Sequence, residues 1–78
     1  MQIKTTSDFG NLVRVTRKLL NMTQPELAGA CGTGLRFIVD LEKGKPTCEI
    51  EKVLTVASML GIRIEAVVPD IDAGGEDG

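Results

Sequence analysis

The sequence contains no histidine, tryptophan or tyrosine, and it has only two phenylalanines. Without histidine no Cys–His dyad can form, and two cysteines without histidine at close spacing do not make a zinc site. The GTG stretch at residues 32–34 lacks the GK[ST] sequence that follows in a phosphate-binding loop. We therefore predict a protein that is not an enzyme and that holds no metal ion and no cofactor.

Long apolar runs and cysteines are also scarce. No stretch approaches the roughly 18 consecutive apolar residues of a membrane span. The N-terminal MQIKTTSDFG lacks the basic-then-apolar layout of a secretory signal. In a cytosolic protein two cysteines are usually reduced and packed, so we expect no disulfide between Cys31 and Cys48. These absences predict a cytoplasmic protein without a membrane partner.

The chain of 78 residues is long enough for one domain only. At this size a single core supplies about 3–5 kcal/mol of stability unless another source adds to it. Because a disulfide is not expected, oligomerisation is the source that we favour.

The net charge of −2 argues at first against a nucleic-acid partner, but the charge is unevenly distributed. The last nine residues, DIDAGGEDG, contain four of the eleven acidic residues and no basic one. Residues 1–69 therefore carry nine basic and seven acidic side chains, a net charge of +2. We predict a mildly basic domain over residues 1–69 and a disordered acidic tail over residues 70–78.

Hydrophobic periodicity and capping residues predict the first two helices. The first is expected over residues 8–20, with Ser7 as its N-cap. The second is expected over residues 24–31, where Thr23 and Glu26 have the spacing of a capping box.

Two further helices are expected in the second half of the chain. One spans residues 34–43, and the next follows Thr47, its expected N-cap. The apolar stripe of this last helix is predicted to be Ile50, Val53, Leu54, Ala57 and Leu60. Val56 and Met59 lie off that stripe, either as ordinary periphery or as part of a dimer interface.

After the last helix the hydrophobic period changes from 3.6 to 2, which predicts a strand over residues 62–68. A lone strand needs a partner, and a second copy of the same strand is the economical one. That pairing would place Arg63 opposite Glu65 of the other chain. Pairing with residues 2–5 of the same chain is the alternative. The expected dimerisation residues are Ile62, Arg63, Ile64, Glu65 and Ala66.

The middle of the chain, MTQPELAGACGTGLRFIVDLEKGKP, places two short helices on either side of a tight turn that contains glycine. Such a pair forms a helix-turn-helix, whose second helix enters the major groove of DNA. The N-terminus of the first helix of the pair faces the phosphate backbone, where free N–H groups and the Gln24 side chain can bind an oxygen. We therefore predict binding to double-stranded DNA.

This stretch resembles the phage repressor/Cro-like (XRE) helix-turn-helix family. TQPELA and the later GLRFIVDLEKGKP follow that family's TQ-x-ELA…I-x-x-LE-x-GK pattern, and the resemblance covers residues 9–61 without a gap. The matching positions are Thr23, Gln24, Glu26, Leu27, Ala28, Gly32, Ile38, Leu41, Glu42, Gly44 and Lys45. Within the family, LVRVTRKLLNMTQ, RFIVDLEKGKPT and LGIRIE are most similar to the HipB-type antitoxins.

The resemblance implies roles by position. Gln24 would hold one backbone phosphate, and Lys43 and Lys45 would hold another. The family's base-facing positions fall on Gly34, Leu35, Arg36, Val39 and Asp40. Arg17 and Glu42 fall on a pair that commonly forms a partly buried salt bridge between the first and third helices.

The sequence departs from the family pattern at these base-facing positions, which we call the reading edge. Gly34 replaces the usual polar N-cap, and the side chains of Leu35 and Val39 offer no hydrogen bonds. Arg36 is then the one strong base reader, because its guanidinium can bridge O6 and N7 of guanine. Asp40 can accept from N4 of cytosine, and the two apolar side chains can contact a thymine methyl group.

The fold predicted from these patterns is an all-α, repressor-like helix-turn-helix bundle of four to five helices, with a short C-terminal strand that pairs across a dimer. The resemblance implies a homodimeric transcriptional repressor that binds a palindromic operator. It further implies an antitoxin that binds a HipA-type serine/threonine kinase toxin and represses their shared operon. The alternatives are a free-standing regulator without a toxin partner and a module that binds only protein.

Overall fold

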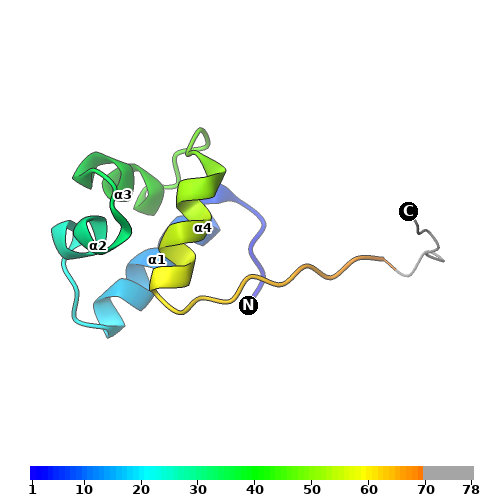
Figure 1. Ribbon diagram of the computed structural model, residues 1–78. Coiled ribbons are helices and arrows are strands. Elements are labelled where there is room, and N and C mark those ends of the chain that lie inside the picture. Colours follow the sequence, from blue (N-terminus) through cyan, green and yellow to red (C-terminus); the bar gives the residue numbers. More distant parts are fainter. Residues whose placement is uncertain (70–78) are drawn as a thin grey trace.

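The computed structural model describes residues 1–69, which form four helices (Figure 1). These are α1 (Thr6–Leu19), α2 (Gln24–Cys31), α3 (Leu35–Glu42) and α4 (Ile50–Met59). The largest contacts join α2 to α3, α1 to α3 and α2 to α4. The all-α prediction is confirmed, whereas the predicted acidic tail lies outside the described residues. Within those residues no helix is both long enough and apolar enough to cross a membrane.

Helix α1 begins two residues earlier than predicted. Its N-cap is Thr5, whose Oγ1 accepts from the backbone N–H of Asp8 at 3.0 Å. The Asp8 carboxylate in turn accepts from the backbone N–H of Thr5 at 3.1 Å, which completes a capping box. Ser7 is not the cap, because glycine rather than an acidic residue stands three positions after it.

Helix α4 begins later than predicted. Its N-cap is Glu49, which makes no side-chain capping bond, and Thr47 lies instead in the turn that follows Pro46. The prediction of Thr47 as the cap was therefore wrong. The loop between α3 and α4 is longer as a result, and α4 offers fewer turns to the core.

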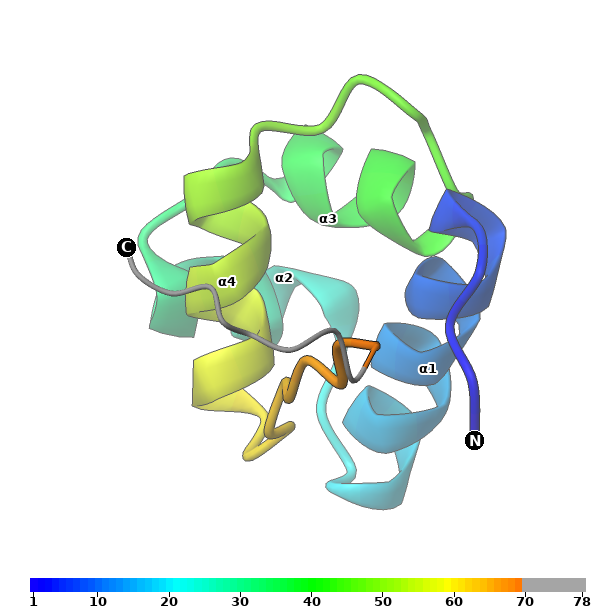
Figure 2. The same ribbon diagram turned by 90° about the vertical axis from the view of Figure 1, so that its right-hand side faces the viewer.

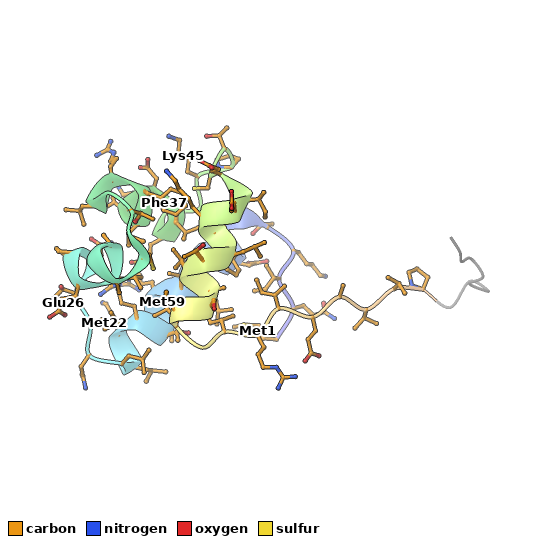
Figure 3. All side chains as sticks on the ribbon, viewed as in Figure 1. Met1, Met22, Glu26, Phe37, Lys45 and Met59 are labelled. Carbon is orange, nitrogen blue, oxygen red and sulfur yellow. The ribbon has the colours of Figure 1, made fainter. Side chains whose placement is uncertain are left out.

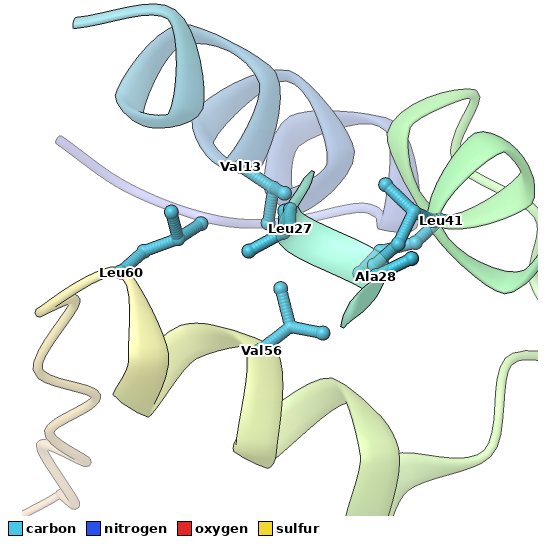
Figure 4. Close-up of a cluster of buried hydrophobic side chains, with 7 residues drawn as sticks. Val13, Leu27, Ala28, Leu41, Val56 and Leu60 are labelled. Atoms are coloured by element: carbon cyan, nitrogen blue, oxygen red, sulfur yellow. The ribbon is translucent and has the colours of Figure 1, made fainter. Parts of the chain in front are cut away.

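The core lies between all four helices, with Leu27 of α2 at its centre (Figure 4). Its buried members are Val13, Leu27, Ala28, Ile38, Leu41, Val56 and Leu60. Val56 is fully buried, whereas Ile50 is 68% exposed and Leu54 is 49% exposed. The predicted stripe of α4 was therefore partly wrong, because the face toward the core runs through residues 53, 56, 57 and 60 and leaves Ile50 and Leu54 at its edge.

Helix α1 crosses the C-terminal end of α3 at Gly10, which is buried. A Cβ atom built on Gly10 would lie 2.3 Å from the carbonyl oxygen of Leu41, so only glycine fits this crossing. At the beginning of α1, the Thr6 hydroxyl donates to the carbonyl oxygen of Gly44 at 2.6 Å. These contacts fix the place of α1 beside α3.

The segment after α4 is extended but forms no sheet with any other part of residues 1–69. No β-strand occurs within residues 1–69, and the segment makes no backbone ladder with residues 2–5. The predicted strand over residues 62–68 is therefore not seen, because the described residues supply no partner strand for it. The N-terminal arm and this segment both lie on the side away from α2 (Figures 1 and 2). Arg63 pairs with Glu65 of its own chain.

Cys31 and Cys48 are free thiols, each partly buried against the core. Burial raises the pKa of the Cys31 thiol, and it also raises the pKa of Cys48, next to the negative charge of Asp40. Both thiols are therefore protonated at neutral pH, which makes them poor nucleophiles. They act as small packing residues, as the sequence predicted.

Candidate nucleic-acid interface

Helix α2 is capped at both ends, and its C-terminal cap permits the short turn to α3. The Thr23 hydroxyl accepts from the N–H of Glu26 at 3.1 Å, and the Glu26 carboxylate accepts from the N–H of Thr23 at 2.8 Å. Gly32 ends the helix with a φ of +70°, a left-handed conformation that favours glycine. The chain can therefore reverse within three residues, and α3 begins at Leu35.

The first turn of α3 presents the exposed edge of the pair. Gly34 is its N-cap without a side-chain bond, so no hydroxyl or carboxylate covers the free N–H groups there. Leu35 is 47% exposed and the Arg36 side chain is 84% exposed. Val39, one turn further along, is half-buried. This edge of α3 therefore presents one arginine together with the aliphatic side chains of Leu35 and Val39.

Asp40 lies at the same edge but is engaged by two cations. One carboxylate oxygen is 3.5 Å from Nε of Arg36, and the other is 3.4 Å from Nζ of Lys45. Its side chain is 21% exposed, so it faces solvent less than Arg36 does. A base that used Asp40 as an acceptor would therefore compete with both cations.

The expected ion pair between Arg17 and Glu42 is present and buried. Nε of Arg17 donates to Oε2 of Glu42 at 2.7 Å, and a second guanidinium nitrogen donates to Oε1 at 3.0 Å. The third nitrogen donates to the carbonyl oxygen of Met22 at 2.8 Å. The exposed fractions of the two side chains are 9% and 3%. The hydrogen bond to Glu42 raises the pKa of Arg17, so the guanidinium stays charged.

Gln24 joins this pair, a contact that the sequence reasoning missed. Its Nε2 donates to Oε1 of Glu42 at 3.1 Å, from the first position of α2. An amide nitrogen carries two hydrogens, so one donor remains for a ligand. The buried pair therefore orients the residue that the sequence assigned to a phosphate.

The residues assigned to dimerisation lie on the side of the molecule away from α2 and α3 (Figure 1). Ile62 is half-buried, and Ile64 is 55% exposed. An apolar groove opens between the N-terminal arm, α1 and α4, and Ile64 contributes to its wall. Its other apolar lining residues are Ile3, Phe9, Leu41, Pro46, Cys48, Ile50, Val53 and Leu54. The structure thus separates the edge of α3 from this apolar surface.

Phe37 and Lys45, both labelled in Figure 3, come from α3 and from the loop after it. Phe37 packs against the core, and Nζ of Lys52 in α4 lies 5.7 Å from the centre of its ring. Lys43 and Lys45 follow α3 and are exposed. They lie on the C-terminal side of the reading edge, where the sequence placed a phosphate contact.

Comparison with known proteins gave one curated relative and close structural neighbours. The relative is the uncharacterised HTH-type transcriptional regulator y4mF of Sinorhizobium fredii, 57% identical over 68 residues, which span 87% of this chain and 90% of that protein. The first neighbour is a HipB serine-to-alanine variant in complex with an O2 20-mer, with a TM-score of 0.80 and 18% identity. It covers 87% of this chain and 94% of the HipB chain.

A second neighbour is HipB in complex with an O4 20-mer. Its TM-score is 0.79 at 18% identity, and the match covers 87% of this chain and 96% of that one. At this level of identity the likeness concerns the fold. No family model matches the chain.

Proposed function

The chain belongs to the HTH-type transcriptional regulators, and we propose that it is a sequence-specific repressor that binds double-stranded DNA through α2 and α3. The observation behind this is the exposed first turn of α3, where the Arg36 side chain is 84% exposed and no side-chain cap covers the free N–H groups. The structural neighbours, which are HipB–operator complexes in the same fold, support it. A regulator of this kind acts on the chromosome, which is consistent with a cytoplasmic location.

In the proposed complex, α3 enters the major groove and the N-terminus of α2 faces the phosphate backbone. Arg36 reads a guanine through O6 and N7. Leu35 and Val39 offer only apolar contact, to a thymine methyl group. Because few side chains read bases, we expect short half-sites in which DNA shape contributes to specificity.

Selection of bound duplexes from a random DNA library tests this function. The wild type is expected to enrich a short palindrome, and Arg36→Ala to blur it at one base pair and to cost about 1–3 kcal/mol per half-site. Arg36→Lys is the matched control, because it keeps the charge but lacks the planar fork that grips guanine. A palindrome that is identical in all three proteins would remove Arg36 from base reading. No enrichment at low salt would favour a module that binds only protein.

We propose further that the protein is a homodimer that pairs residues 62–66 across a two-fold axis. This is supported by a segment of alternating apolar residues that has no ladder partner among residues 1–69 and that lies next to an apolar groove. A palindromic operator requires two recognition helices about 34 Å apart, which a two-fold dimer supplies.

Ile64→Asp tests the dimer. Ile64 is 55% exposed in the single chain, so the substitution should leave the folded protomer intact. It would place a charge within the paired segment, and we expect it to yield monomers in sedimentation experiments at micromolar concentration. Val67→Asp is the control, since Val67 is 95% exposed and lies beyond the residues assigned to pairing. A dimer that survives Ile64→Asp would exclude this segment as the interface.

The third part of the proposal is an antitoxin role, in which the dimer binds a HipA-type serine/threonine kinase and represses their shared operon. The HipB fold of the chain supports it. Co-purification with a kinase encoded in the neighbouring reading frame, together with relief of that kinase's toxicity, tests it. If no such frame exists, the free-standing regulator is the better description.

A further inference from the structure

Helix α1 carries two cations that the family pattern does not assign. Arg14 and Lys18 are four residues apart, so their side chains lie one above the other on one face of α1. Both side chains are exposed. They line a shallow hollow between α1, α2 and α3, which we call the basic hollow. Its lining residues are Arg14, Arg17, Lys18, Gln24, Val39, Glu42 and Lys43.

Within residues 1–69, the positive charge of the basic hollow is not balanced by acidic side chains. Glu42 is the only carboxylate among its lining residues, and both of its oxygens are occupied by Arg17 and Gln24. None of the ion pairs within residues 1–69 involves Arg14, Lys18 or Lys43. Three cations therefore line one hollow with no ion-pair partner in the described part of the chain.

This arrangement costs stability in the free protein. Like charges four residues apart on a helix repel each other by a few tenths of a kcal/mol, roughly 0.2–0.5. Lys18 has a structural reason to be there, since it stands in the last turn of α1, where the helix dipole favours a cation. Arg14 stands in the middle of the helix, where the dipole does not stabilise a cation. An anion bound in the hollow would offset the repulsion between Arg14 and Lys18.

The basic hollow adjoins the edge of α3 that is proposed to face DNA bases, which points to a DNA phosphate as the anion. Val39 belongs both to the hollow and to the base-facing edge of α3, so the two surfaces are continuous. Gln24 contributes its spare amide hydrogen from the beginning of α2. When α3 lies in the major groove, the basic hollow faces the DNA backbone at the border of that groove.

We propose that Arg14 and Lys18, with Lys43 and Gln24, bind one phosphodiester of the operator backbone. This rests on the proposed function, because it takes DNA as the ligand, but it assigns phosphate binding to α1. Phosphate contacts position a protein on DNA without reading its sequence. The α1 cations therefore set affinity and register, while Arg36 sets the preferred sequence.

The test compares Arg14→Gln and Lys18→Gln with Lys52→Gln, which removes one positive charge from α4, a helix that contributes nothing to the hollow. Affinities for the selected palindrome and for a scrambled duplex are measured by fluorescence anisotropy across a range of salt concentrations. A lost phosphate contact lowers the steepness of log K against log salt by about 0.9 per half-site and the affinity about eightfold per half-site at 0.1 M salt. We expect the two α1 variants to approach this loss equally on both duplexes, and Lys52→Gln to stay within twofold of the wild type.

A second measurement locates the contact on the DNA. Neutral methylphosphonate linkages are placed one at a time along the palindrome. In the wild type each contacted phosphate should be a position where the neutral linkage weakens binding, and at one such position per half-site the linkage should have little further effect in Arg14→Gln. Thermal unfolding checks that the variants are folded, as expected for two exposed side chains.

The outcomes separate the basic hollow from the function on which it rests. Equal losses in Arg14→Gln and Lys52→Gln would mean that only overall charge matters, and this would overturn the proposal. A changed sequence preference in Arg14→Gln would also overturn it, since the residue would then read bases or shape. A wild type that binds no duplex at low salt would contradict the proposed function itself.

Discussion

Replacing Gly10 by alanine is expected to lower the free energy of unfolding by about 3 kcal/mol, the upper end of the cost of overpacking. Alanine is the better helix former by about 1 kcal/mol, so helix propensity alone predicts the opposite sign. The reason for the loss is the crossing of α1 over α3. The added Cβ would lie 2.3 Å from the carbonyl oxygen of Leu41 and 2.9 Å from that of Glu42. Both are backbone atoms, so no side chain can turn away to relieve the contact.

Gly29→Ala is the matched control. Gly29 also stands inside a helix, α2, but a Cβ built there meets nothing within 4 Å. This substitution should stabilise the protein by up to about 1 kcal/mol. Urea unfolding followed by circular dichroism measures both variants. If Gly10→Ala were as stable as Gly29→Ala, the two helices would have to be further apart at this crossing than in the structure.

A domain of this size has about 3–5 kcal/mol of stability from its core, so Gly10→Ala should leave much of the protein unfolded at physiological temperature. The loss would extend to DNA binding, because α1 contributes Arg14 and Lys18 to the basic hollow and Arg17 to the buried pair. The matched control should bind DNA normally, since Gly29 is exposed and lies outside the lining of the basic hollow.

The helix-turn-helix itself could be predicted from the sequence because its signals are local. Thr23 and Glu26 form the predicted capping box, and Gly32 ends α2 where the pattern placed the end. The bounds of α2 agree with the prediction, and those of α3 differ by one residue at each end. Each of these features depends on residues within one or two turns of each other.

Contacts between distant segments could not be predicted in the same way. Gly10 looked like an ordinary helix residue, because its constraint comes from Leu41 on another helix. Val56 was placed off the stripe because the orientation of α4 is set by the face of α2 that it meets. The bond from Gln24 to Glu42 depends on the same tertiary arrangement. The partner of residues 62–68 is a further case, since a strand pattern does not say which chain completes it.

The buried pair gives the second large effect. Replacing Glu42 by glutamine keeps the shape of the side chain but leaves Arg17 as an unpaired buried charge. Removal of one partner of a buried pair costs about 3–5 kcal/mol. The exposed fractions of 9% and 3% justify the full value, because water screens neither side chain well. Urea unfolding of Glu42→Gln should show most of the stability lost, and a loss below 1 kcal/mol would contradict a buried ion pair here.

Titration cannot replace this substitution as a test. The folded-state pKa of Arg17 is raised, so its contribution to stability is fully present below the unfolded-state pKa and is lost only as the pH rises through the higher folded-state pKa. That window lies far above neutral pH. The stability that depends on the charge of Arg17 should therefore be constant throughout the physiological pH range. Mutagenesis is the decisive experiment.

The double variant Arg17→Met/Glu42→Met distinguishes the contribution of the pair to stability from its contribution to DNA binding. Replacing a whole buried pair by apolar side chains of similar volume is often neutral or stabilising, so unfolding should return to within about 1–2 kcal/mol of the wild type. The carbonyl oxygen of Met22 loses its guanidinium donor, which accounts for a remaining deficit. Gln24, however, also loses the carboxylate that orients it.

A stable double variant with weakened binding to every duplex would show that the pair positions Gln24 for a phosphate. Unchanged affinity would mean that the pair serves only to join α1 to α3. If the double variant does not regain stability, the hydrogen bonds of Arg17 contribute more to the free energy of unfolding than apolar side chains of similar volume do. The reason to expect the first outcome is geometric: Oε1 of Glu42 accepts from both Arg17 and Gln24, so the core and the proposed DNA surface share one oxygen atom.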